Sequence, residues 1–227
     1  MTSDYWQTFE PAFITFIRDI KSADPAHDFA HIERVVSMAK KLSLAESADL
    51  NVVVPAAWFH DSVAVAKNSP DRPIASRLAA DKARAALEQL NYESALLPAI
   101  EHAIIAHSYS ANVTPCSLEA KIVQDADRMD ALGAVGVARC MLVGGSIGRT
   151  LYEPSDPLCE QRKPEDLKYT VDHFFTKLLH IGDTMNTESA KREARRRTDY
   201  MREFLLQLKR DIQAEDLDIQ LRTPVAG

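Results

Sequence analysis

The hydrophobic residues of this chain recur with the period of an α-helix almost from end to end. The stretch 28–43 shows the pattern most clearly. Its apolar residues at i, i+3, i+4, i+7 and i+10 are Ile32, Val35, Val36, Ala39 and Leu42. Such a stripe forms one face of an amphipathic helix, whereas the alternation of apolar and polar residues typical of strands is nearly absent. The pattern predicts an all-α protein.

The same period predicts helices along most of the remaining chain. These helices span 4–21, 28–43, 74–90, 93–107, 117–142, 165–182 and 187–213, together with one that leads into residues 56–66. That last helix either begins near Pro55 or bends there, because proline has no amide hydrogen to donate. Residues 117–142 are mostly apolar, and we expect them to form one long central helix.

The longest predicted loop runs from Gly144 to Pro164 and is rich in Gly, Pro, Ser and Asp. A loop of this length inside a compact domain is uncommon and often functional. Neither an internal repeat nor a change of composition marks a domain boundary, so we expect a single domain over residues 1–215. The remaining residues, 216–227, are expected to form a loose tail.

Composition and charge narrow the functional classes. The 227 residues are 46% hydrophobic and 26% charged, the balance of an ordinary globular protein. No apolar stretch reaches the roughly 18 to 20 residues that cross a bilayer, and the N-terminus lacks the basic region of a secretory signal. The three cysteines lack CxxC spacing, which argues against a disulfide framework, and a net charge of −6 disfavours nucleic-acid binding. We expect a cytoplasmic protein that binds neither membranes nor nucleic acids.

The sharpest chemical feature is the pair His60-Asp61 inside a run that is otherwise apolar. A carboxylate buried there is destabilising unless it is paired or bound to a cation. His60 follows Val52 and Ala56 at helical spacing and shares their face. The alternative interpretation is a core histidine that is hydrogen-bonded to the neighbouring acid, and an isolated His-Asp pair would favour it.

Two further segments carry comparable groups. His31 begins the inward stripe of residues 28–43, where a histidine is more often a core or capping residue. Asp125, Asp127 and Asp130 lie within one and a half turns of the mostly apolar segment 117–142. Helix geometry alone does not choose between Asp125 and Asp127, and either could pair with an arginine instead.

Taken together, the segments supply two imidazoles and two carboxylates from inward helix faces. This mixed nitrogen and oxygen set suits a divalent transition ion (manganese, iron, cobalt or nickel) better than a structural tetrahedral zinc. Two coordination positions would stay open for water and substrate. The set therefore predicts metal-assisted hydrolysis.

The segments HIERV, WFHD and DADRMDALG, in this order, resemble the H…HD…D signature of the HD-domain (His-Asp) superfamily of metal-dependent phosphohydrolases. The segments ASRLAA, DADRMDALGAVGVAR and HFFTKLL are similar to those of its small stand-alone bacterial branch, and the resemblance runs from about residue 24 to about residue 205. It implies a single helical bundle around a metal held by His31, His60, Asp61 and Asp127, and so favours Asp127 over Asp125. The residues after the pair, SVAVA, offer no acid, whereas some relatives use a carboxylate there in catalysis.

The resemblance also implies the activity. We expect hydrolysis of a small phosphate ester or anhydride, in particular a nucleotide, by a nucleotidase, pyrophosphohydrolase or phosphodiesterase reaction. The cofactor would be Mn, Co, Ni or Fe, with Mg also compatible, and a homodimer is compatible with the sequence. Two rival functions are an HD-fold di-iron oxygenase and a non-catalytic nucleotide-binding module.

Further polar residues are candidates for substrate contact or for support of the metal. The candidate phosphate contacts are Arg72, Arg77, Arg149, Lys163, Lys168 and Lys177. The candidate supporting groups, or ligands of a second ion, are Glu101, His102, His107 and Asp130. Surface charge is the alternative for each basic residue, and helix capping is the alternative for the histidines. Because the loop that begins at Gly144 contains several of the basic residues, we expect it to lie beside the substrate.

Overall fold

The structure is a computed structural model that describes residues 5–18, 28–63 and 72–213. The described residues are helical, apart from loops and one isolated parallel bridge between Thr150 and Tyr169. The α-helices are α1 (Glu10–Arg18), α2 (Phe29–Glu46), α3 (Leu50–Phe59), α4 (Ala75–Gln89), α5 (Leu97–His107), α6 (Leu118–Met129), α7 (Gly133–Ser146), α8 (Asp172–Thr176) and α9 (Glu188–Gln213). The 3₁₀ turns are Tyr5–Thr8, Arg72–Ile74, Ser94–Leu96, Tyr109–Ala111 and Leu178–Thr184. The all-α prediction is confirmed. The predicted tail at 216–227 lies outside the described residues.

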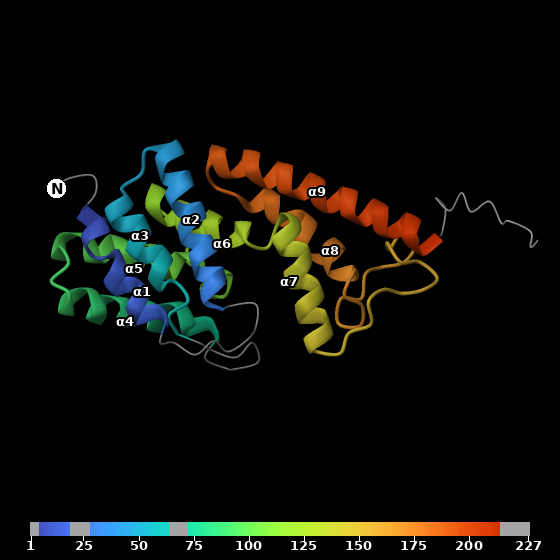
Figure 1. Cartoon of the computed structure of the whole chain (residues 1–227), viewed down its shortest axis with the longest axis horizontal. Helices are drawn as coiled ribbons and strands as arrows, with labels where there is room; N and C mark the ends of the chain where they lie inside the picture. The colour runs from blue at the N-terminus through green and yellow to red at the C-terminus, as the bar shows by residue number, and fades with distance from the viewer. Residues whose placement is uncertain (1–4, 19–27, 64–71, 214–227) are drawn as a thin grey trace, which may run out of the picture.

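Helices α1 to α6 form a bundle that occupies one side of the molecule (Figure 1). Helix α3 lies at its centre, against α1, α2, α5 and α6. The apolar stripe predicted for 28–43 is buried as expected, from Ile32 to Leu42. Phe13 of α1 meets Phe59 of α3 edge to face, with ring centroids 5.6 Å apart. This packing fixes the C-terminal end of α3, where the His-Asp pair follows.

Helix α3 starts five residues before Pro55, so the alternative in which it begins at this proline is wrong. Its N-cap is Asp49, whose carboxylate accepts a hydrogen bond from the amide of Asn51. Within the helix, Pro55 has no amide to donate to the carbonyl oxygen of Asn51. The hydroxyl of Tyr92 donates to that oxygen instead, at 2.8 Å. A side chain from outside the helix therefore replaces the hydrogen bond that proline removes.

The predicted helix over 117–142 is wrong, because the chain turns between α6 and α7. Gly133 has a φ of +70°, a backbone conformation that disfavours residues with a side chain. Gly136 lies so close to the turn that a Cβ there would meet the carbonyl oxygen of Ala131 at 2.2 Å. The turn ends α6 just after the candidate ligand Asp127 and leaves Asp130 at its C-cap.

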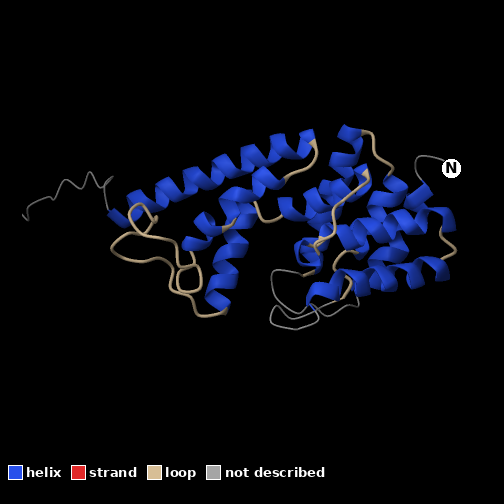
Figure 2. Ribbon diagram, turned by 180° about the vertical axis from the view of Figure 1, so that it is seen from behind, coloured by secondary structure: helices blue, strands red, loops and turns tan. Residues whose placement is uncertain are grey.

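Helices α7, α8 and α9 form the other side of the molecule, and α9 is long enough to contact α2 and α6 as well as α7 (Figures 1 and 2). Helix α7 continues to Ser146, so the predicted loop begins after it. The predicted helix over 165–182 is also wrong in its first part. Residues before Asp172 instead form turns, held by hydrogen bonds from Arg162 and from the amide of Glu165 to the Asp172 carboxylate.

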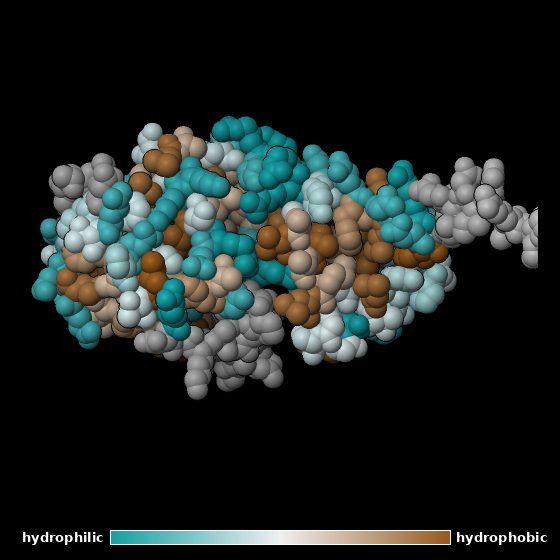
Figure 3. All heavy atoms as spheres, viewed as in Figure 1, coloured by the Kyte–Doolittle hydropathy of each residue, from teal (hydrophilic) through white to brown (hydrophobic). Residues whose placement is uncertain are grey.

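The side formed by α7 to α9 exposes several apolar side chains. Leu142 and Ile147, at the end of α7, are 51% and 58% exposed, and Figure 3 shows hydrophobic atoms gathered over this side.

Among the residues that the structure describes, no helix combines the length and the apolar character that crossing a bilayer requires.

Candidate metal centre

His31 lies in the first turn of α2, with its side chain fully buried. The N-cap residue Asp28 accepts a hydrogen bond from the His31 amide at 2.9 Å, which fixes the start of the helix. The Nε2 atom of His31 lies 3.6 Å from Oδ1 of Asp127 and 3.8 Å from Oδ2 of Asp61. The start of α2 therefore brings one imidazole to both carboxylates.

His60 is the residue that follows the last turn of α3. Its Nδ1 lies 2.7 Å from the carbonyl oxygen of Ala57, so Nδ1 carries the proton and donates to that oxygen. Its Nε2 lies 3.8 Å from both Asp61 Oδ2 and Asp127 Oδ1. This Nε2 is buried, with no hydrogen-bond partner among the described residues. Burial also lowers the pKa of His60, which favours the neutral form that binds metals.

Asp125 and Asp127 leave α6 in different directions, although they are two residues apart. The carboxylate of Asp127 lies beside His31 and His60, as described above. Asp125 is fully buried and accepts four hydrogen bonds at 2.8 to 2.9 Å, from the amide and side chain of Asn186 and from the amide and hydroxyl of Thr187. Asp125 thus connects α6 to the start of α9, and Asp127 lies with the histidines.

The spacing of these atoms fits ligands of a single ion. Ligand atoms about 2.1 Å from a metal lie roughly 3.0 Å apart when adjacent in an octahedron and about 4.2 Å apart when opposite. The pairs that join His31 or His60 to Asp61 or Asp127 are 3.6 to 3.8 Å apart. Because the buried Nε2 of His60 is left without a hydrogen-bond donor, the residues present fit a divalent ion.

Asp130 sets the orientation of His31. Its Oδ2 accepts a hydrogen bond from Nδ1 of His31 at 2.7 Å, so Nε2 keeps its lone pair toward the other candidate ligands. Arg34 of α2 and Arg139 of α7 also donate to the Asp130 carboxylate, at 2.7 to 3.0 Å. Although burial opposes ionisation, the hydrogen bonds from His31 and Arg34 hold the pKa of Asp130 far below its usual range. Asp130 therefore stays ionised at neutral pH.

Replacing Asp130 with asparagine is expected to weaken metal binding by about 10- to 100-fold, the usual effect of losing a carboxylate that orients a ligating histidine. The neutral amide would accept more weakly from His31, and its NH₂ group would face the two arginines. Competition with a chromophoric chelator measures the affinity. Glu33→Gln, on the same helix as His31, serves as the control. Equal metal affinity for Asp130→Asn and wild type would contradict the orienting role.

His107 joins the same group from the end of α5. It is buried, its Nδ1 lies 2.5 Å from the carbonyl oxygen of Ile104, and its Nε2 lies 3.7 Å from Oδ1 of Asp61. The rings of His60 and His107 are nearly perpendicular, with centroids 4.9 Å apart. Although burial opposes it, interaction with Asp61 raises the pKa of His107. Two sets of ligand atoms could thus hold a metal ion, one from His31, His60 and Asp127 and the other from His60, Asp61 and His107.

The other two polar residues predicted on α5 lie elsewhere. Nε2 of His102 accepts a hydrogen bond from the amide of Cys116 at 3.0 Å. This bond fastens the segment after α5 to the helix. Glu101 forms an ion pair with Arg84 of α4. Neither residue contributes an atom to the two sets of candidate ligands found among the described residues.

The predicted phosphate contacts are spread over both sides of the molecule. Arg77 is exposed in the first turn of α4, and the side chain of Arg72 lies outside the described part of the chain. Lys168 is exposed and pairs with Glu165 at 2.8 Å, while Lys163 and Lys177 are also exposed. Arg149 is partly buried and close enough to Asp166 and His173 to shift their pKa values. Figure 1 shows the loop after α7 beside α8 and α9 rather than within the bundle.

Sequence analysis did not find Arg34 and Arg139, the two arginines that hold Asp130. The one signal for Arg34 is its spacing, because it follows His31 by three residues and so lies on a neighbouring helix position. Arg139 gives no such signal, since its contact depends on the turn between α6 and α7.

The chain is similar to one protein family and to several known bacterial proteins. The HD domain family matches residues 28–132, from the N-cap of α2 to the end of the turn after α6. Bacillus subtilis YpgQ, an uncharacterized protein, is 32% identical over 209 residues, which cover 90% of this chain and 94% of YpgQ. An HD-superfamily hydrolase from Bacillus thuringiensis has a similar crystal structure (TM-score 0.72, 35% identity, 92% of this chain and 98% of the hydrolase covered). The structure of YpgQ in complex with ADP is also similar (TM-score 0.70, 32% identity, 89% and 97% covered).

Proposed function

Because the chain belongs to the HD superfamily of hydrolases, we propose that it is a metal-dependent phosphohydrolase that acts on a nucleotide. His31, His60, Asp61 and Asp127 would hold the ion. This assignment rests on the convergence of their side chains, which three separate helices bring together. His107, beside Asp61, would be a fifth ligand or a proton donor at the same place.

The observation that carries the proposal is the uneven burial of the four residues. The imidazoles are 0 to 1% exposed, whereas the side chains of Asp61 and Asp127 are 31% and 28% exposed. The histidines therefore form a buried floor, and the carboxylates face the side that solvent reaches. An ion held there would have positions open to water and substrate.

Each protein group has a separate part in this proposal. A bound divalent ion would polarise a phosphoryl oxygen and lower the pKa of a coordinated water. Asp130 keeps His31 in the correct tautomer, and the carbonyl oxygen of Ala57 does the same for His60. Arg128, which follows Asp127 in α6, would bind a substrate phosphate.

A nucleotide is the proposed substrate class because of the relatives. YpgQ, which shares the fold over nearly the whole chain, has been crystallised with ADP. Nucleotide phosphates are also the esters and anhydrides on which an open mixed nitrogen and oxygen metal site can act. We also propose that the protein forms a homodimer, with the exposed Leu142 and Ile147 at the end of α7 in the contact surface.

A screen of metals against substrates tests this function. Protein stripped with a chelator is reloaded with Mn²⁺, Co²⁺, Ni²⁺, Fe²⁺ or Mg²⁺ and assayed for phosphate or pyrophosphate release from nucleoside tri-, di- and monophosphates and an aryl phosphate. We expect turnover of at least one nucleotide, restored by a transition metal after stripping. If the protein binds these ions yet hydrolyses none of the substrates, the proposal is wrong. If iron-loaded protein instead consumes oxygen, the di-iron alternative holds.

A further inference from the structure

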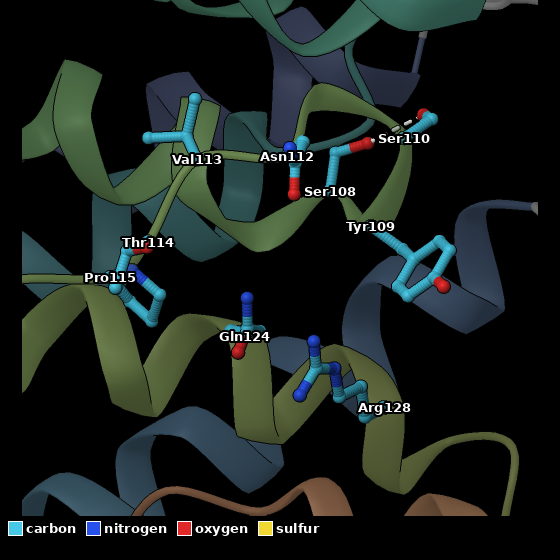
Figure 4. Close-up of a pocket in the computed structure, with 9 residues that line it drawn as sticks. All are labelled: Ser108, Tyr109, Ser110, Asn112, Val113, Thr114, Pro115, Gln124 and Arg128. Carbon is cyan, nitrogen blue, oxygen red and sulfur yellow. Dashed lines mark hydrogen bonds between the residues drawn. The ribbon is translucent and has the colours of Figure 1, made fainter.

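A cavity opens between the segment that follows α5 and one face of α6 (Figure 4). Its volume is about 500 Å³, within the usual range for small-molecule sites. Ser108, Tyr109, Ser110 and residues 112–115 of the segment form one wall, and Gln124 and Arg128 rise from α6 to form the other. Hydroxyl, amide and guanidinium groups thus line a space that is open to solvent.

This cavity adjoins the candidate metal centre through both of its walls. Ser108 directly follows His107, whose ring faces Asp61. On α6, Gln124 and Arg128 lie three residues before and one residue after Asp127. Because positions three apart in a helix are neighbours, Asp127 lies next to the lining residue Gln124 on α6, although Asp127 itself is not part of the lining. A ligand in the cavity could therefore extend to the two carboxylates.

The walls are held in place by the surrounding structure. Gln124 donates to the carbonyl oxygen of Ala106 at 2.7 Å and accepts from the side chain of Asn186 at 2.9 Å. The hydrogen bond from the Cys116 amide to His102 fastens the far end of the segment to α5. The cavity is thus largely formed before any ligand arrives, which lowers the entropic cost of binding.

Arg128 is a half-buried cation that interacts electrostatically with Asp125 and Asp127 but forms no direct ion pair with a described residue. Its Nη1 donates to the carbonyl oxygen of Thr184 at 2.7 Å, and the described residues give it neither a second hydrogen bond nor an ion pair. Its remaining N–H groups face the cavity (Figure 4). A phosphate would supply the missing acceptors in the bidentate geometry that arginine favours.

Tyr109 lies at the mouth of the same cavity and is 91% exposed. A large aromatic side chain left in water beside a polar cavity is a platform on which a planar ring can stack. Its ring and the guanidinium of Arg128 lie on the same side of the cavity (Figure 4), close enough for an electrostatic interaction. The two groups are thus spaced to contact different parts of one ligand.

We propose that this cavity binds the nucleoside end of the substrate, with Tyr109 stacking on the base and Arg128 binding a phosphate that extends toward Asp61 and Asp127. The inference rests on the proposed nucleotide function and adds the residues that select a nucleoside. It makes Tyr109 a specificity residue, since an inorganic polyphosphate has no base to stack. Arg128, by contrast, would contact both kinds of substrate.

The test compares a nucleotide with a phosphate chain that lacks the nucleoside. KM is measured for ATP and for inorganic triphosphate, and the affinity for ADP is measured by calorimetry with metal-loaded protein. Tyr109→Ala is expected to raise KM for ATP and Kd for ADP about tenfold or more, and to leave KM for triphosphate unchanged. Tyr109→Phe keeps the ring and is expected to behave as wild type. Arg128→Gln is expected to raise KM for ATP and for triphosphate alike.

Tyr200→Ala, on α9, is the matched control for an exposed tyrosine elsewhere, and it is expected to change neither constant. If Tyr109→Ala binds ADP and turns over ATP as wild type does, the cavity does not bind the nucleoside, although the proposed function stands. If Tyr109→Ala weakens ATP and triphosphate equally, Tyr109 does not contact the base and the inference is also wrong. If wild type neither binds ADP nor hydrolyses any of the nucleotides with any of the metals, both the inference and the proposed function are wrong.

Discussion

Asp61→Ala is expected to remove bound metal and hydrolysis together. The two oxygens of Asp61 lie 3.7 to 3.8 Å from Nε2 of His31, His60 and His107, so one carboxylate serves three imidazoles. Without it the ion would lose a charged ligand. We expect the loss of affinity to exceed the roughly 10- to 100-fold effect of a group that only orients a ligand. Hydrolysis should fall to the level of the assay blank.

Metal content after gel filtration, measured by plasma mass spectrometry, checks this prediction. Asp199→Ala is the control, because Asp199 is an exposed residue of α9 that pairs only with Arg202 in the described structure. An Asp61→Ala protein that keeps one ion per chain would show that Asp61 is no ligand. Full activity in such a protein would also contradict the proposed role of the carboxylates.

Asparagine substitutions at Asp125 and Asp127 are expected to have opposite effects. Asp125→Asn should lower the free energy of unfolding by about 3 to 5 kcal/mol, because an amide cannot accept from all four donors of Asn186 and Thr187. It should bind metal as wild type wherever it is folded. Asp127→Asn should keep its stability in the presence of a chelator and lose metal affinity, because a neutral amide oxygen is a weaker ligand for a divalent ion.

Urea unfolding in the presence of a chelator and metal titration at low urea measure the two effects separately. The chelator matters, because metal binding would otherwise add to the stability of the folded state. The reverse result, with metal loss at Asp125→Asn and unfolding at Asp127→Asn, would show that the ligand assignment is shifted by two residues.

Periodic patterns in the sequence were sufficient to predict most helices. The stripe from Ile32 to Leu42 is buried in α2, and the capping residues Asp28 and Asp49 precede helices as their side chains favour. The same logic placed His31 and His60 on inward faces, and in the structure their Nε2 atoms lie 3.6 and 3.8 Å from Oδ1 of Asp127. A polar residue on an inward helix face that has no partner nearby in the sequence is expected to have a partner from a distant segment.

Features that depend on contacts distant in the sequence were not predicted. The apolar pattern continues through the turn between α6 and α7, because the positive φ of Gly133 leaves no periodic trace. Periodicity alone left Asp125 and Asp127 as alternatives, and only the family resemblance favoured Asp127, because the four donors to Asp125 come from the distant residues Asn186 and Thr187. The arginines at 34 and 139 resemble ordinary surface charges until the helices that carry them are packed around Asp130.

The contacts of Asp130 link the two sides of the molecule. This residue ends α6, orients His31 of α2, and accepts hydrogen bonds from Arg139 of α7 through both its carboxylate and its carbonyl oxygen. A tilt of α7 would therefore change the charge that His31 experiences through Nδ1. By thermodynamic reciprocity, an ion that prefers the fully bonded Asp130 would also favour the packed position of α7. Metal binding beside His31 and the packing of α7 are thus coupled, and the carboxylate of Asp130 is the group that they share.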